Sequence, residues 1–459
     1  MKFTKIVCTI GPASDTLPMM RRLIRAGMNV ARLNFSHGTY THHAQLIRNL
    51  RRAATLEGQP IAILQDLQGP RIRVGEVPDA GVLLKNSERV TLVPQSAYSE
   101  KSKTKELPYH YARLAQEVEA GQHILIADGV IDLRILRISG PDITCVVLVG
   151  GLIKSHKGIN VPGATFSVVA VTEKDKKDLV FGVEHKVDYI ALSFVRTPEH
   201  VKSARTLLKR LSKKHPSAAH MGIIAKIERP EAVHDFEKIL SVVDGVMIAR
   251  GDLGIEMPPQ RIPVIQKELI QKCIAAHKPV IVATQMMESM ITSRRATRAE
   301  VSDVANAVID HTDAVMLSGE SAAGKYPLET VQLMSRTIHE AEKSKYDDYV
   351  CSSIRKETSI KAMIAHAAAD LARTKKLACI VIEDDDSDLV RFITGHRPEL
   401  QVIGFSRTAR VRQQLNLIRG VQMYAPQKNI VRFLKSQKLV RAGDLYAVVE
   451  ADEVEITVA

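Results

Sequence analysis

Buried strands and amphipathic helices alternate through the first 75 residues of the chain. The strand-like runs are apolar without strict alternation, which is typical of strands covered on both faces. Apolar residues between them recur at helical spacing, and Gly27 follows the first such stretch as a helix-ending glycine would. The expected elements are the strand Lys5 to Ile10, the helix Leu17 to Ala26, the strand Asn29 to Asn34, the helix His42 to Leu56 and the strand Ile61 to Leu64. This β-α-β-α-β order predicts a parallel sheet.

The rhythm changes after Gly75. From about Glu76 to Ile153 the segments are short, β-rich and broken by Pro and Gly, with no long helical pattern. The strands expected there are Val90 to Val93, His123 to Ile126, Asp132 to Ile138 and Ile143 to Val149. Residues 76–156 are therefore predicted to form an inserted, β-barrel-like lid domain that leaves and re-enters at one end of the third strand.

Alternation of helices and strands resumes at Thr172. The expected helices are Lys174 to Phe181, Pro198 to Ser212, Pro263 to Ala276, Ala299 to His311 and Leu328 to Lys343. The expected strands are Tyr189 to Ser193, Gly222 to Ile227, Val243 to Ala249, Val280 to Ala283 and Ala314 to Leu317. With the first three strands these make eight, which predicts a (β/α)8 TIM barrel of about 250 residues once the insertion is removed. An open, doubly wound sheet is the alternative.

The barrel is expected to comprise residues 1–75 and 157–345. A polar stretch, KSKYDDYVCSS (Lys343 to Ser353), is predicted to contain a linker. The last part, residues 346–459, has a helical pattern at Ile364 to Ala372 and strand patterns at Cys379 to Ile382 and Val402 to Phe405. It is predicted to form a small C-terminal α/β domain.

The composition is typical of a globular protein and argues against membrane, secreted and disulfide-rich classes. The 459 residues are 45% hydrophobic and 25% charged, as in globular proteins of two or three domains. No apolar run approaches the roughly 20 residues of a membrane span, and the strand-like start after Lys2 has no signal-peptide pattern. Five scattered cysteines show neither zinc nor disulfide spacing. We therefore expect reduced thiols and a cytoplasmic protein without a membrane partner.

The chain is basic, with 64 Lys and Arg against 51 Asp and Glu and a net charge of +13. Nucleic acid is one partner that such a charge would attract. Aromatic residues make up only 4% and Trp is absent, which argues against a platform for base stacking. We expect no nucleic-acid partner and interpret the charge as a general attraction for phosphorylated metabolites.

Polar and charged residues stand at the carboxyl ends of six predicted strands, where the catalytic groups of a (β/α)8 barrel gather. They are Arg32, Asn34, Ser36 and His37 after the second strand, Asp66, Arg71 and Arg73 after the third, Lys226, Glu228 and Arg229 after the fifth, Arg250, Gly251 and Asp252 after the sixth, Thr284 and Gln285 after the seventh, and Ser318, Gly319 and Glu320 after the eighth.

Within this set, the sixth strand ends in RGDLG, where two glycines bracket Asp252. Such a turn exposes backbone N–H groups and suits an anion held beside a hard cation. A tight βα turn with a capping aspartate is the simpler interpretation of this stretch alone. A prolyl pair then precedes the next helical pattern.

Lys226 and Glu228 stand two residues apart and therefore share one face of a strand. The apolar run before them indicates a central strand, where Lys and Glu are rare unless paired or functional. Glu228 and Asp252, from adjacent strands, offer two carboxylate oxygens to Mg²⁺. Arg32, Lys226 and the cation would surround a phosphoryl group with positive charge, which is the main requirement of phosphoryl transfer. Thr284 is either a core or capping hydroxyl or part of this site, and Glu320 either caps a helix or relays a proton.

Long stretches of the chain resemble pyruvate kinase. They are TKIVCTIGPAS (Thr4 to Ser14), MNVARLNFSHG (Met28 to Gly38), KGINVPG (Lys157 to Gly163), AKIERPEAV (Ala225 to Val233), MIARGDLGIEMP (Met247 to Pro258), VATQMMESM (Val282 to Met290), TRAEVSDVANAV (Thr297 to Val308) and MLSGESAAGKYP (Met316 to Pro327). The insertion matches weakly and the C-terminal part only in outline. The resemblance implies phosphoryl transfer from phosphoenolpyruvate to ADP, protonation of the enolate to pyruvate, the last step of glycolysis, and a homotetramer.

The resemblance also implies roles for single residues. Lys226 would stabilise the transferring phosphoryl group, Glu228 and Asp252 would hold Mg²⁺, and Arg32 would contact phosphate. Thr284, with the backbone at Gly251 and Asp252, would hold the substrate carboxylate.

The nucleotide side follows from the same resemblance. Arg73 and Lys157 match the family's nucleotide contacts, and the lid would close over them and exclude water. A barrel lyase that stabilises an enolate on Mg²⁺ would need neither residue. A basic scaffold or RNA-binding protein, the non-enzymatic alternative, would be expected to have lost the site residues.

The family's K⁺ positions are only partly matched. Asn34, Ser36 and Asp66 agree, but DLQGPRIR (Asp66 to Arg73) has Leu67 in place of a threonine and Arg71 in place of a glutamate. A guanidinium is ionised at every relevant pH, so Arg71 would supply the charge that K⁺ otherwise brings. We hypothesise that K⁺ is dispensable; the alternative is that Arg71 points to solvent and the K⁺ site works normally.

Control by a sugar bisphosphate is not expected. Family members with that control tend to have a Thr-x-Ser-Gly phosphate loop in the C-terminal domain. Asp384 and Asp386 fall on its hydroxyl positions and Ser387 on its glycine. Carboxylates repel a phosphate, and loss of the glycine hinders close backbone approach.

Overall fold

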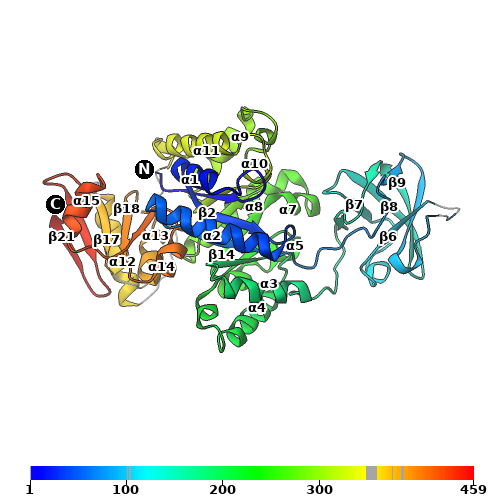
Figure 1. Ribbon diagram of the computed structural model, residues 1–459, viewed down its shortest axis with the longest axis horizontal. Coiled ribbons are helices and arrows are strands. Elements are labelled where there is room, and N and C mark those ends of the chain that lie inside the picture. Colours follow the sequence, from blue (N-terminus) through cyan, green and yellow to red (C-terminus); the bar gives the residue numbers. More distant parts are fainter. Residues whose placement is uncertain (1, 101, 103–104, 348–358, 375, 384–386) are drawn as a thin grey trace.

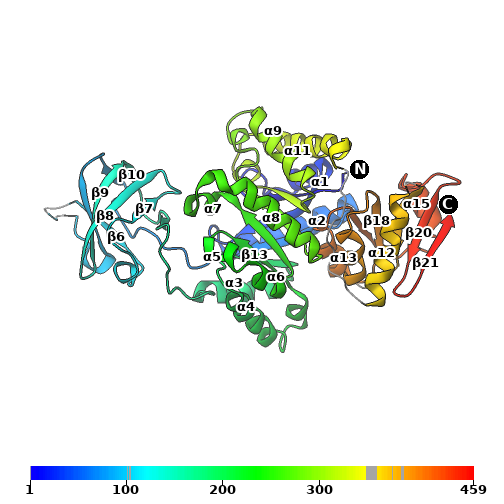
Figure 2. The same cartoon turned by 180° about the vertical axis from the view of Figure 1, so that it is seen from behind.

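The computed structural model describes residues 2–459 except 101, 103–104, 348–358, 375 and 384–386. Three parts follow one another along the longest dimension of the molecule (Figure 1). The C-terminal part lies at one end, the barrel in the middle and the β-rich insertion at the other end. The view from behind shows the same order (Figure 2).

Eight parallel strands close into a barrel, which confirms the predicted fold and excludes the open sheet. They are β1 (Lys5–Thr9), β2 (Met28–Asn34), β3 (Ala62–Asp66), β12 (Tyr189–Leu192), β13 (Gly222–Ile227), β14 (Gly245–Ala249), β15 (Val280–Ala283) and β16 (Ala314–Leu317). Each strand pairs with its neighbours in the sequence of barrel strands, and β1 pairs with β16 to close the ring. All eight carboxyl ends therefore lie at the same end of the barrel.

Helices surround the barrel between these strands. They are α1 (Leu17–Ala26), α2 (Tyr40–Glu57), α3 (Glu173–Glu184), α4 (Pro198–Leu211), α5 (Pro230–His234), α6 (Phe236–Val242), α7 (Arg250–Glu256), α8 (Ile262–Ala275), α9 (Arg298–Ile309), α10 (Gly319–Ala322) and α11 (Pro327–Glu342). Local chemistry fixes several helix starts, because Thr172 with Asp175 and Thr297 with Glu300 form capping boxes. Gly27, at φ 120°, ends α1 as predicted.

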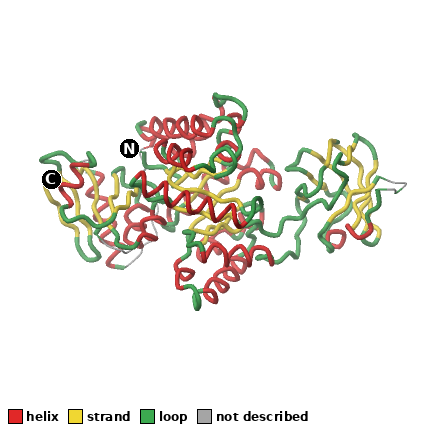
Figure 3. Tube along the Cα trace, viewed as in Figure 1, coloured by secondary structure: helices red, strands yellow, loops and turns green. Residues whose placement is uncertain are grey.

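The insertion consists of strands joined by loops, with no long helix among its described residues, as Figure 3 shows at its end of the molecule. A six-stranded sheet has the order β11 (Ile159–Asn160), β7 (His123–Ile126), β8 (Ile131–Ser139), β9 (Asp142–Val149), β5 (Arg89–Pro94) and β6 (Glu106–Tyr109). A two-stranded sheet joins β4 (Val82–Leu84) to β10 (Gly151–Ile153). All four expected strands of this region are present, and they enclose their own apolar core.

The C-terminal part contains a five-stranded sheet, as predicted for an α/β domain. Its order is β19 (Val421–Tyr424), β18 (Gln401–Phe405), β17 (Leu377–Ile382), β20 (Leu445–Val449) and β21 (Val454–Val458). The helices are α12 (Ile360–Arg373), α13 (Ser387–Gly395), α14 (Ala409–Leu415) and α15 (Ile430–Ser436). Of the phosphate-loop positions, Asp384 and Asp386 lie outside the described residues.

The predicted linker is structured at its start. Asp347 is buried, and one of its carboxylate oxygens lies 2.8 Å from the guanidinium of Arg419. This part of the polar stretch therefore belongs to the contact between the barrel and the C-terminal part, while residues 348–358 lie outside the description. No described helix combines the length and apolar character that a bilayer crossing requires.

A repeated polar contact is found at the amino end of the barrel, opposite the carboxyl ends of the strands where the predicted site residues stand. At the start of every second strand an Asn or Asp accepts one backbone N–H from the first two residues of the preceding strand and also contacts a cationic side chain. The four sets are Asn29 with Ile6 and Lys2, Asp188 with Ile63 and Arg51, Asp244 with Ile223 and Arg205, and Asp313 with Val280 and Arg397. Each satisfies a backbone donor that the end of the sheet would otherwise leave unpaired.

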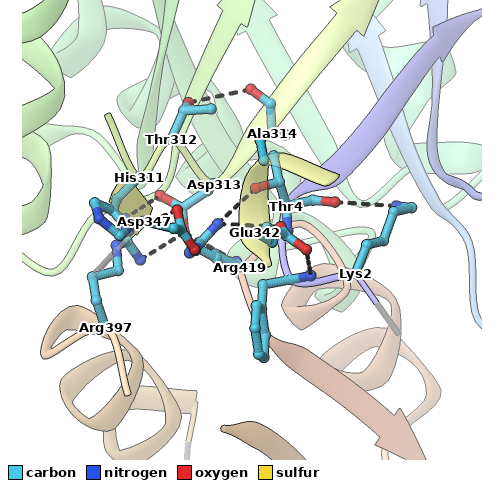
Figure 4. Close-up of polar contacts among 12 residues, drawn as sticks. Lys2, Thr4, His311, Thr312, Asp313, Ala314, Glu342, Asp347, Arg397 and Arg419 are labelled. Carbon is cyan, nitrogen blue, oxygen red and sulfur yellow. Dashed lines mark hydrogen bonds and ion pairs between the residues drawn. The ribbon is translucent and has the colours of Figure 1, made fainter. Parts of the chain in front are cut away.

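The fourth of these contacts crosses to the C-terminal part (Figure 4). Arg397 donates to both carboxylate oxygens of Asp313, at 3.1 and 2.9 Å, and the backbone N–H of Arg419 donates to the same group at 3.0 Å. Apolar packing reinforces the contact, because Leu417 is buried among the inward-facing residues of the barrel strands. The C-terminal part thus closes the amino end of the barrel and leaves the other end free.

Candidate functional site

The centre of the candidate site is the ammonium group of Lys226, near the carboxyl end of β13. It lies 2.8 Å from Oε1 of Glu228 and 3.4 Å from Oδ1 of Asp66. It also donates to the hydroxyl of Ser193 at 2.8 Å, and that hydroxyl donates to the carbonyl of Leu67 at 2.7 Å. Residues at the ends of three barrel strands therefore converge on one buried cation.

These groups shift one another's ionisation. Burial lowers the pKa of Lys226, but Asp66 and Glu228 outweigh this effect and hold it above its ordinary value. Burial alone would raise the pKa of Asp66. The positive charges of Lys226 and Arg32 outweigh burial and hold this pKa below its usual range. Burial raises the pKa of Glu228, and Lys226 offsets this only in part. The cluster has a charged lysine and a charged Asp66 at neutral pH.

Arg32 lies beside this cluster, as predicted. Its Nε donates to Oδ2 of Asp66 at 2.7 Å, and its terminal nitrogen donates to the hydroxyl of Thr9 at 3.0 Å. The side chain of Arg32 is 12% exposed. Asp66 thus stands between two cations, and a phosphoryl group in the adjoining space would meet positive charge from both.

That space is a cavity of about 150 Å³. The predicted residues that line it are Arg32, Asn34, Ser36, His37, Asp66, Leu67, Arg71, Arg73, Lys226, Glu228 and Asp252. The four residues at the K⁺ positions of the resemblance are all among them. The Asn34 side chain also accepts the N–H of Ser36 at 3.1 Å, which orders the loop after β2.

A larger cavity of about 1040 Å³ adjoins the first, because Arg71 and Asp252 line both. Gly251, Thr284 and Gln285 line it too. The N–H of Gly251 donates to the Thr284 hydroxyl at 2.7 Å. Thr284 has φ 73° and Gln285 φ 55°, a left-handed pair that non-glycine residues rarely adopt.

The turn after β14 differs from the sequence expectation. An additional short helix, α7, begins at Arg250 directly after the strand, and the helix expected after the prolyl pair is present as α8. Arg250 fixes this start, since its guanidinium donates to the Thr284 carbonyl at 2.8 Å and to Oδ1 of Asp303 at 2.7 Å. Asp252 therefore sits in the first turn of a helix, where a carboxylate is favoured.

The insertion contacts two of the arginines that line the cavities. Arg71 forms an ion pair with Asp128 of the insertion, and its guanidinium lies 3.8 Å from Oδ1 of Asp252. Arg73 donates to the carbonyl of His156 at 2.9 Å. The Lys157 side chain is exposed to solvent on the same connection.

Glu320 is held by local contacts. Its carboxylate accepts the N–H of Met287 at 3.1 Å and that of Ser318 at 2.7 Å, and burial raises its pKa against these two donors. Among the described residues, those that line the two cavities do not include Glu320. The contacts fit the capping interpretation, and the proton-relay role stays a prediction.

The residues fit a hard divalent cation. Glu228 and Asp252 line one cavity, and Oε2 of Glu228 accepts the N–H of Phe194 at 2.6 Å, which fixes its orientation. Carboxylate oxygens suit Mg²⁺, which takes one or two of them and completes its shell with water and substrate. Within the described part of the chain no cluster of three or more His, Cys, Asp or Glu could hold a metal by itself.

Comparison with known proteins identifies the family. Residues 1–331 match the model for the pyruvate kinase barrel domain, and residues 362–457 match that for the pyruvate kinase alpha/beta domain. The chain belongs to the pyruvate kinase family. Members of this family transfer the phosphoryl group of phosphoenolpyruvate to ADP and need a divalent metal ion.

Individual pyruvate kinases agree over most of their length. The chain is 43% identical to pyruvate kinase 2 of Synechocystis sp. over 91% of this chain and 70% of that protein. It is 38% identical to pyruvate kinase of Thermococcus litoralis over 99% and 96%. The crystal structure of a pyruvate kinase from Cryptosporidium parvum superposes with a TM-score of 0.92 at 35% identity and covers all of this chain and 96% of that one.

Proposed function

We propose that the carboxyl end of the barrel is where this chain carries out the family reaction, with Mg²⁺ as the metal. The observation that supports this placement is the buried Lys226 ammonium. It faces a cavity that Arg32, Glu228 and Asp252 also line. Lys226 stabilises the transferring phosphoryl group and Arg32 contacts phosphate. Glu228 and Asp252 hold Mg²⁺, which when bound neutralises the charge on substrate oxygens.

The remaining residues orient the substrates. Thr284 and the backbone N–H groups at Gly251 and Asp252 hold the carboxylate of phosphoenolpyruvate. The 2.7 Å hydrogen bond from the Gly251 N–H to the Thr284 hydroxyl places these groups side by side, and this N–H would exchange the hydroxyl for the carboxylate. Arg73 and Lys157 contact ADP. The insertion, residues 76–156, acts as a lid that closes over the nucleotide and excludes water. Glu320 takes part in returning a proton to the enolate.

A coupled assay for pyruvate tests this function. Pyruvate should form from phosphoenolpyruvate only when both ADP and Mg²⁺ are present. Pyruvate formed without ADP would show transfer of the phosphoryl group to water instead of ADP, and no pyruvate under any condition would favour the lyase or the non-enzymatic protein over the kinase.

We infer a homotetramer, which sedimentation velocity would measure. The described cysteines, Cys8, Cys145, Cys273 and Cys379, are free and buried, which supports a reducing compartment such as the cytoplasm.

We predict full activity without K⁺. Arg71 lines both cavities and reaches toward Asp252, which supports its acting as a fixed positive charge at the site. Replacement of Arg71 by Glu should create a K⁺ requirement. The measurement is the initial rate in buffer free of sodium and potassium, with tetramethylammonium as counter-ion.

Arg89→Glu is the matched control for this charge reversal, because Arg89 is an exposed arginine at the start of β5 that lines neither cavity. It should leave the rate independent of K⁺. A rise of about tenfold or more when K⁺ is added to the unmodified enzyme contradicts the hypothesis.

We also predict no response to fructose bisphosphate. The carboxylates of Asp384 and Asp386 would repel its phosphates at the positions where a responsive loop has hydroxyls. The measurement is the saturation curve for phosphoenolpyruvate with rising bisphosphate. A leftward shift of several-fold would contradict this prediction.

A further inference from the structure

Glu256, the last residue of α7, is a buried acid that the sequence pattern did not single out. Its side chain is only 2% exposed. Burial of a carboxylate costs several kcal/mol unless cations or hydrogen-bond donors compensate it. The partners of Glu256 therefore matter more than those of a surface acid.

Two donors from distant parts of the chain meet at one oxygen of this carboxylate. The guanidinium of Arg229 lies 2.6 Å from Oε1 of Glu256. The side-chain amide of Asn160 donates to the same oxygen at 2.7 Å. Asn160 is itself 3% exposed, so the junction of these three side chains is shielded from water.

Each residue of the junction belongs to a different segment of the chain, and each of these segments has a proposed role in the reaction. Arg229 directly follows Glu228 at the end of β13. Glu256 lies four residues after Asp252 on α7, which is about one helical turn. Asn160 ends β11, the strand that returns from the lid and pairs with β7. One carboxylate thus ties together the two segments that carry the proposed metal ligands and the lid.

Phe194 strengthens the connection to Glu228. Its backbone N–H donates to Oε2 of Glu228 at 2.6 Å. Its ring lies 5.7 Å from the guanidinium carbon of Arg229, within the range of a cation–π contact. Arg229 is therefore held between the Phe194 ring and Glu256, and its place in the chain fixes that of Glu228.

We propose that Glu256 is a positioning residue of the metal site, which holds Glu228 and Asp252 at the spacing that a divalent cation requires and connects that spacing to the lid through Asn160. This inference rests on the proposed role of Glu228 and Asp252 as metal ligands. Groups that support metal ligands from outside change metal affinity by about 10- to 100-fold when removed. Glu256 acts through Arg229 and α7 and does not itself contact metal or substrate.

The test is direct binding of Mn²⁺ to the metal-free protein of 459 residues, measured from the electron paramagnetic resonance signal of the unbound ion. Glu228→Gln, the ligand variant, should weaken Mn²⁺ binding by about 100-fold or more. Glu256→Ala should weaken it about 10- to 100-fold, within the range for supporting groups. Glu256→Gln keeps an acceptor for both donors and should recover part of the loss, and Asn160→Ala should weaken binding about threefold.

Glu342→Gln is the matched control. Glu342 is also a buried glutamate that accepts two backbone N–H groups and contacts an arginine, but it lies at the opposite end of the barrel. It should change Mn²⁺ affinity less than about twofold even if it lowers the melting temperature, so a general loss of stability cannot imitate the expected result.

The outcomes separate the two levels of the proposal. Wild-type Mn²⁺ affinity in Glu256→Ala, with weakened affinity in Glu228→Gln, overturns the role of Glu256 and leaves the metal site standing. Wild-type affinity in Glu228→Gln overturns the metal site itself. If Glu256→Ala does not fold, Asn160→Ala and Glu256→Gln decide, and wild-type affinity in both overturns the role of Glu256.

Discussion

Replacement of Lys226 by alanine is expected to lower kcat by at least about 10²- to 10³-fold, the range for removing one preorganised group that stabilises developing charge. The ammonium group is fixed by Glu228, Asp66 and Ser193 before substrate arrives, so little reorganisation is needed during transfer. The measurement is steady-state pyruvate formation at saturating phosphoenolpyruvate, ADP and Mg²⁺.

Lys5→Ala is the matched control for loss of a buried lysine. Lys5 is 3% exposed and donates to the carbonyl of Val421 at the amino end of the barrel, away from the cavities. It should cost stability and leave kcat close to that of the wild type. A Lys226→Ala enzyme that is folded and turns over at nearly the wild-type rate would remove Lys226 from the mechanism.

The barrel could be predicted because its elements are specified locally. The limits of β13 and β15 agree with the sequence expectation, since each is a short apolar run that ends in a polar residue or loop. Capping residues and Gly27 do the same for helices. Residues at the carboxyl ends of the strands were then expected to lie close together, because all strands of a parallel barrel end on the same face. Five of them do line one cavity: Arg32, Asp66, Lys226, Glu228 and Asp252.

Two contacts of the site were missed although the same rule points to them. The sequence expectation named no residue at the ends of the first and fourth strands. Thr9 ends β1 and accepts from Arg32, and Ser193 follows β12 and accepts from Lys226. Both are hydroxyls at strand ends, and consistent use of the rule would have included them.

Other features were not predictable from local sequence. The helix α7 depends on Arg250, whose partners Thr284 and Asp303 lie far along the chain. Glu256 depends on Asn160, which is 96 residues away. Contacts of this kind are set by how the elements pack, and neither composition nor periodicity records them.

The amino end of the barrel gives the clearest case of a long-range contact with a large energetic role. Asp313 and Asp244 stand at equivalent positions, since each precedes a strand, accepts a backbone N–H of the preceding strand and contacts an arginine. They differ in the source of that arginine. Arg205, the partner of Asp244, belongs to a helix of the barrel, and its side chain is 44% exposed. Arg397, the partner of Asp313, belongs to the C-terminal part, and its side chain is 4% exposed.

Replacement of Asp313 by alanine is therefore expected to lower the free energy of unfolding by about 3–5 kcal/mol, the cost of leaving a buried charge without its partner. The buried guanidinium of Arg397 would lose both of its contacts with Asp313, and the N–H groups of Val280 and Arg419 would lose their acceptor. The loss should fall on the junction, so the C-terminal part should unfold before the barrel. Urea unfolding followed by circular dichroism, with limited proteolysis at intermediate urea, measures both effects.

Asp244→Ala provides the comparison, because it removes the same strand contact but leaves an arginine that water can solvate. A partly exposed ion pair contributes at most about 1 kcal/mol, so this variant should be destabilised much less and should unfold in one transition. Since both aspartates lie at the end of the barrel opposite the cavities, neither variant should change the KM for phosphoenolpyruvate while folded. Equal unfolding midpoints for the two variants would show that Arg397 gains nothing from Asp313, and the junction would then depend on apolar packing around Leu417 instead.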